Sequence, residues 1–97
     1  MNNLTNEIPK YVKSVLWSYD TKAMNIQDDK NRIIVNVLNF GNKQATDWLM
    51  KTYGKEVIKK SIENSLQGDW NRKSLNFWTL IFNIDKNNIK KRSEYVL

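Results

Sequence analysis

The fold is decided by residues 71–84, which read NRKSLNFWTLIFNI. A helix over this stretch would carry large apolar side chains on nearly every side. They are Leu75, Phe77, Trp78, Leu80, Ile81, Phe82 and Ile84. Only its first turn, with Arg72 and Lys73, is strongly hydrophilic. A helix that is apolar all round must be covered by other elements, so we predict that it forms the buried centre of the fold and presents a basic N-terminal end to solvent.

Four shorter helical patterns precede this stretch and could cover it. Each has apolar residues at helical spacing, with capping or terminating residues at its ends. The expected ranges are about 9–19, 29–40, 43–53 and 55–66. The β-branched residues 33–35 could form a strand instead, but Asp28 or Asp29 as a cap, the stop at Gly41 and the spacing together favour a helix. We therefore predict an all-α bundle of about five short helices.

The length of 97 residues is enough for one hydrophobic core, so we expect a single domain. Residues 1–7 are polar and expected to be flexible, residues 8–84 form the helical domain, and residues 85–97 read as a basic tail that does not pack. The beginning of the chain lacks the features of a signal peptide, and no segment is apolar enough to span a membrane. We expect a cytoplasmic protein.

The composition favours binding over catalysis. Sixteen Lys and Arg residues against ten Asp and Glu give a formal net charge of +6, which suits an acidic partner or nucleic acid. Histidine and cysteine are absent, which removes the commonest general base and the usual transition-metal ligands. None of the three glycines lies in a phosphate-binding loop. We predict that the chain is not an enzyme and needs no metal or cofactor.

The helices expected at 55–66 and 71–84, with a short break between them, have the order of a helix-turn-helix motif. In that motif the first residues of the second helix face DNA bases and phosphates. The predicted nucleic-acid contacts are Arg72, Lys73, Asn76, Lys55 and Lys59. The alternative is an ordinary solvated helix start, in which Asn71 or Ser74 is only a cap.

A protein partner would have other candidate contacts. Trp70 lies in the break beside Gly68 and either plugs the corner between two helices or stands exposed for a partner. The tail has scattered apolar residues among cations, so it is either disordered or folds upon a partner. The predicted partner contacts are Trp70, Lys60, Lys90, Lys91, Arg92 and Tyr95.

Several short segments carry a family resemblance. They are LWSYD at 16–20, VLNFG at 37–41 after the isoleucines 33–34, WL at 48–49, YGKE at 53–56 and SLNFW at 74–78. Their order across residues 8–84 resembles a family of small uncharacterised bacterial helical proteins, often encoded beside AbiE-type, nucleotidyltransferase-like toxins. The chain departs from that pattern at Ser18, where the family tends to have Asp, and before Asn71, where a Leu-Ser pair is missing.

The resemblance implies a helical fold and an antitoxin that binds and neutralises a co-encoded toxin, and it supplies no catalytic residue. Two other functions stay open. One is a helix-turn-helix DNA-binding regulator, which could control the same operon, and the other is a structural or adaptor subunit of a phage or defence assembly. DNA binding that responds to salt would indicate the regulator. A fixed stoichiometric complex without effect on toxicity would indicate the adaptor.

Overall fold

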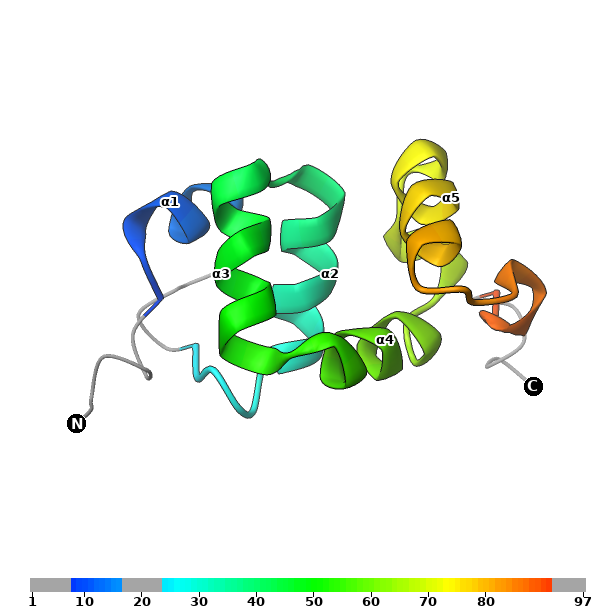
Figure 1. The fold of residues 1–97 in the computed structure, drawn as a ribbon, viewed down its shortest axis with the longest axis horizontal. Helices are drawn as coiled ribbons and strands as arrows, with labels where there is room; N and C mark the ends of the chain where they lie inside the picture. Colours follow the sequence, from blue (N-terminus) through cyan, green and yellow to red (C-terminus); the bar gives the residue numbers. More distant parts are fainter. Residues whose placement is uncertain (1–7, 17–23, 92–97) are drawn as a thin grey trace.

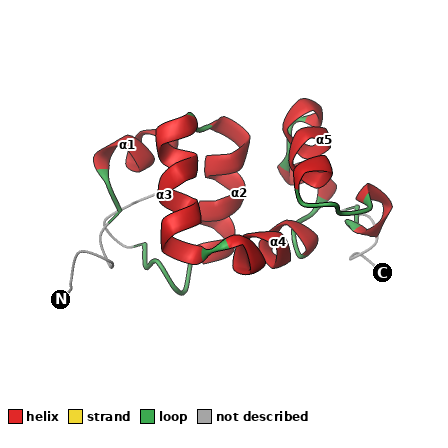
Figure 2. Cartoon of the chain, in the orientation of Figure 1, coloured by secondary structure: helices red, strands yellow, loops and turns green. Residues whose placement is uncertain are grey.

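The structure is a computed structural model that describes residues 8–16 and 24–91. Within these residues the chain forms five α-helices and no strand beyond one isolated bridge (Figures 1 and 2). The helices are α1 Lys10–Lys13, α2 Lys30–Phe40, α3 Lys43–Tyr53, α4 Lys55–Glu63 and α5 Arg72–Ile81. Short 3₁₀ turns occupy Ser14–Leu16, Gln67–Asp69 and Lys86–Asn88. The predicted all-α class is confirmed.

Helix α2 is the centre of the molecule. It packs against α3, α4, α5 and the turn at Ser14–Leu16. Five of its eleven residues are buried. They are Ile33, Ile34, Val35, Val37 and Leu38. In Figure 1, α3 runs beside α2, and α4 leads from the lower end of α3 past the lower end of α2 toward α5. The predicted apolar stripe of this helix is therefore the core of the fold.

The corners between these helices form where the capping residues predict them. The Asn42 side chain accepts a hydrogen bond of 3.0 Å from Ala45 N and starts α3. A Cβ at Gly41 would lie 2.6 Å from the carbonyl oxygen of Val37, so the chain can turn this tightly only with glycine there. Gly54 joins α3 directly to α4 with a φ of 83°, a conformation that strongly favours glycine.

The prediction that residues 71–84 form the buried centre is wrong. Helix α5 stands to one side of the molecule (Figure 1), and of its residues only Leu75 and Thr79 are buried. The physical reason is that α2 already fills the space between α3 and α4 with its own apolar residues. Helix α5 can reach the core with one face only, and its remaining apolar residues stay in solvent.

Two boundaries also differ from the prediction. Helix α1 ends at Lys13 and continues as a 3₁₀ turn to Leu16, and the rest of the expected 9–19 helix lies outside the described residues. Helix α4 ends at Glu63, before the expected Leu66, because a new turn begins at Gln67.

The first part of the predicted tail is packed against the domain. Ile89 is 1 % exposed, and the carbonyl oxygen of Lys90 accepts a hydrogen bond of 2.9 Å from Gln67 N. The boundary placed at residue 84 is therefore wrong, because Ile89 gives the polar segment an apolar anchor. The expectations for residues 1–7 and 92–97 fall outside the described residues. No described helix has the length and apolarity needed to cross a membrane.

Candidate functional site

Helix α5 is attached to the C-terminal end of α2 by hydrogen bonds. Asn39 is the main link: its Nδ2 donates to Asp69 O (3.0 Å) and its Oδ1 accepts from Asn71 N (3.1 Å). Its carbonyl oxygen accepts from Ser74 Oγ (3.1 Å). One residue earlier, Leu38 O accepts from Trp78 Nε1 (2.8 Å). These bonds fix which face of α5 points to the core and which points outward.

The outward side of α5 is apolar. Phe77, Leu80 and Ile81 are 52 %, 79 % and 55 % exposed. Exposed Lys73 lies one turn before Phe77 and two turns before Leu80 on the same side. We call Lys73, Phe77, Leu80 and Ile81 the outer face. Among the described residues the only other large hydrophobic residue that is exposed is Phe40, which follows Asn39 at the end of α2.

The basic N-terminal end of α5 is in solvent, as predicted. Asn71 caps the helix by accepting a hydrogen bond of 3.1 Å from Ser74 N, and Arg72 and Lys73 are both exposed. Asn76, a predicted base contact, instead accepts a hydrogen bond from Lys86 Nζ. The first turn thus presents two cations and no acidic residue.

The structure does not gather the predicted nucleic-acid contacts into one surface. Lys55 lies at the N-terminal end of α4, and α5 follows the opposite end, about 12 Å away along the axis of α4. Lys59 is partly buried. Arg72, Lys73 and Asn76 share a helix, but the groove-facing side of a recognition helix would here carry Phe77 and Leu80.

Trp70 is a buried plug and not an exposed contact. It is 7 % exposed, and its Nε1 donates a hydrogen bond of 2.8 Å to Ser65 Oγ. Its prediction as a partner contact is therefore wrong: the 3₁₀ turn before it folds the indole into the corner between α4 and α5. Lys60, Lys90 and Lys91 are exposed, and Arg92 and Tyr95 lie outside the described residues.

A polar groove of about 390 Å³ between α2 and α4 was not predicted. It is lined mainly by amide, hydroxyl and charged side chains. Its polar lining residues are Asn31, Arg32, Asn36, Ser61, Asn64, Ser65 and Asp69. Inside it, Ser61 Oγ donates to Asn31 Oδ1 (2.7 Å). This bond joins α4 to α2 across the groove and stabilises the contact between the two helices.

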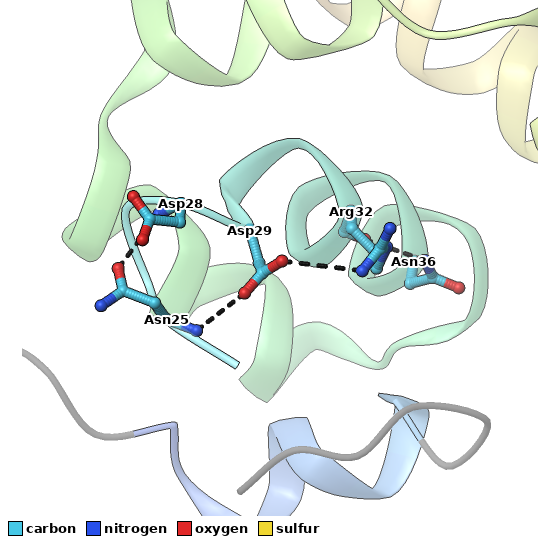
Figure 3. Close-up of polar contacts among 5 residues, drawn as sticks. All are labelled: Asn25, Asp28, Asp29, Arg32 and Asn36. Carbon is cyan, nitrogen blue, oxygen red and sulfur yellow. Dashed lines mark hydrogen bonds and ion pairs between the residues drawn. The ribbon is translucent and has the colours of Figure 1, made fainter. Parts of the chain in front are cut away.

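The acidic residues before α2 have local structural partners (Figure 3). Asp29 Oδ2 accepts from Asn25 N (2.8 Å), and Asp29 Oδ1 lies 3.6 Å from Arg32. Asn36 Nδ2 donates to Arg32 O, one turn back in α2. Among the described residues no three His, Cys, Asp or Glu side chains gather as metal ligands would. The Asp29 contacts thus join the residues before α2 to its first turn.

Sequence reasoning missed the outer face because it assigned all apolar residues of 71–84 to the core. The signal was present, since the stretch has more apolar circumference than a helix at the edge of a small domain can bury. It missed the role of Asn39 for another reason. The partners of that side chain are 30 or more residues away, and no local pattern connects them.

The fold and this surface define the class of protein: a small all-α domain with an exposed apolar helix face beside two exposed cations. The chain belongs to a family of unknown function, DUF6922, whose model matches residues 12–62, more than half of the chain. The match begins within α1, includes α2 and α3, and ends one residue before the end of α4. Helix α5 lies outside it. Comparisons with curated proteins and with solved structures found no match.

Proposed function

We propose that this protein is an antitoxin-like binding protein of the bacterial cytoplasm, which neutralises a co-encoded, nucleotidyltransferase-like toxin by direct contact. The observation that carries the proposal is the exposed outer face of α5. Exposing three large hydrophobic side chains to water is unfavourable, and the free energy falls when another protein covers them. Exposed apolar clusters of this kind mark interaction surfaces.

The charge of the chain supports the same proposal. An enzyme that transfers nucleotides binds metal ions through carboxylates, so its cleft is acidic. A partner with a formal net charge of +6 would be attracted to such a cleft over a long range, and this attraction raises the rate of encounter.

The test is co-expression of the protein with the product of the neighbouring toxin gene. We expect the two to co-purify and the antitoxin to restore growth of cells that make the toxin. Absence of a complex at micromolar concentration would remove the proposal. A stable complex that leaves toxicity unchanged would support the adaptor function instead.

DNA binding is the second candidate, and the exposure of Arg72 and Lys73 at the start of a ten-residue helix favours it. The double variant Arg72→Ala, Lys73→Ala should bind the promoter DNA of its own operon more weakly and keep its fold. Wild-type affinity should fall steeply with salt, since each phosphate contact releases counterions. The control is Lys13→Ala, Lys51→Ala, which removes the same charge from exposed positions elsewhere. An equal loss of DNA affinity in both double variants would count against a specific binding site at the start of α5.

A further inference from the structure

We propose that α5 is a docking helix, whose outer face enters an apolar groove of the partner protein with acidic residues on its rim. This inference rests on the proposed function, since the partner is taken to be the co-encoded toxin. It adds the element that binds, the side chains that enter the groove and the chemistry of the surface that receives them.

The spacing of the outer face is that of a helix that docks into a groove. Lys73, Phe77, Leu80 and Ile81 stand at i, i+4, i+7 and i+8, which places them along one side of α5. Helices recognised by hydrophobic grooves use anchors at this spacing. The four positions span about 12 Å of helix axis, so a groove of two or three turns would cover them.

The outer face is held rigid before any partner arrives. On the opposite side Leu75 and Thr79 are buried, and Trp78 donates its hydrogen bond to Leu38 O. The Phe77 ring packs edge-on against Trp78, with ring centroids 4.8 Å apart and planes at 87°. Because the helix and one anchor are already positioned, binding would cost little conformational entropy.

The charges around the outer face indicate an acidic rim. Helix α5 contains no acidic residue, and both cations of its first turn are exposed. The nearest acids in the chain, Asp69 and Asp85, lie beyond the two ends of the helix, where they accept hydrogen bonds from Leu66 N and Asn87 N. Carboxylates on the partner near Arg72 and Lys73 would complement this end of α5.

Two other occupants of an apolar face fit this surface less well. A second copy of the chain would bring the same cations and the same net charge of +6 to the contact. A membrane surface would be held by only the three large apolar side chains of the outer face, and binding to a membrane interface grows with the apolar area that is buried.

The experiment measures the affinity of the purified toxin for the full-length protein and two variants by calorimetry at low and high salt. Leu80→Gln removes the most exposed anchor, and we expect Kd to rise about tenfold or more. Lys73→Glu should raise Kd at low salt and flatten its salt dependence. Lys51→Glu is the matched control, because it makes the same charge change at an exposed position of α3 and should alter Kd far less.

Each remaining outcome overturns the inference. Toxin that binds Leu80→Gln as tightly as wild type would leave the proposed function standing and remove α5 as the docking helix. Toxin that does not bind wild type would remove both. If wild type sediments with vesicles of phosphatidylcholine and phosphatidylglycerol and Leu80→Gln does not, the outer face binds a membrane. A dimer in analytical ultracentrifugation that Leu80→Gln abolishes would assign it to a second copy.

Discussion

Tyr53 shows how one side chain ties the chain before α2 to the bundle. It ends α3, and its hydroxyl donates a hydrogen bond of 2.9 Å to Ile26 O. Its ring meets Trp48 edge-on, with centroids 6.1 Å apart. Burial, together with the negative charge of Asp29, raises the pKa of the Tyr53 hydroxyl above its ordinary value. The folded state therefore favours the neutral phenol.

Replacing Tyr53 with Phe should change how stability depends on pH. Both states of the wild type hold the phenol proton below about pH 10, the ordinary pKa of tyrosine. Above that pH the unfolded chain ionises first, so the wild type loses stability as pH rises through the raised pKa. Urea unfolding from pH 7 to 11 should show a steeper decline for wild type than for Tyr53→Phe. At pH 7 the variant should be less stable by about 1 kcal/mol for the lost hydrogen bond. If the free energy of unfolding fell equally with pH in wild type and Tyr53→Phe, ionisation of Tyr53 would not be the cause of the decline.

At the scale of elements, the corner between α3 and α4 depends on one backbone conformation. Gly54 has a φ of 83° and a ψ of 162°, and a Cβ there would meet no atom within 4 Å. The cost of a side chain is therefore strain in the backbone and not a clash.

Gly54→Ala should lower the free energy of unfolding by about 1–3 kcal/mol, because alanine rarely adopts this conformation. Gly68→Ala is the matched control, since a Cβ there also meets nothing within 4 Å and its φ is not positive. Its stability should stay the same or rise slightly. Thermal unfolding of both variants measures the difference, and equal losses would show that φ is not the cause.

Helix α5 is a second case at this scale, since Asn39 attaches it to α2. In Asn39→Ala the amides of residues 67–82 should exchange hydrogen faster, while α2, α3 and α4 stay protected. The control is Asn36→Ala, whose amide donates to Arg32 O within α2. Hydrogen exchange read by mass spectrometry separates the segments. Uniform loss of protection across the chain would mean that α5 does not open independently.

At the scale of the whole molecule, the segment after α5 closes the domain. Ile89 and Ile84 are buried, and Gln67 Nε2 donates to Ile89 O at 2.8 Å. The turn at Gln67–Asp69 is thus held between α4 and residues 84–90. The folded unit extends well beyond residues 12–62, which the family model matches.

Ile89→Ala should therefore lower the free energy of unfolding by about 2–5 kcal/mol, as for other buried isoleucines. The same substitution at Ile81, on the exposed outer face, should change it by no more than about 0.5 kcal/mol. Urea unfolding followed by tryptophan fluorescence compares the two. A small effect at Ile89 would show that the segment does not contribute to the fold.

The sequence by itself determined the helices and their corners. Asn42, Gly41 and Gly54 act through hydrogen bonds and backbone angles within a few residues, so local pattern was sufficient to place α2, α3 and the start of α4. The buried stripe of α2 followed from helical spacing for the same reason.

Only the tertiary structure decided which helix is central and which apolar side chains remain exposed. Leu75 and Leu80 are the same residue type in the same helix, yet they are 6 % and 79 % exposed. Helical spacing shows that they point in different directions, but the element that covers one of them is α2, more than 30 residues earlier in the chain. Burial depends on such distant contacts, and so the candidate docking face emerged only once α5 was placed against Asn39.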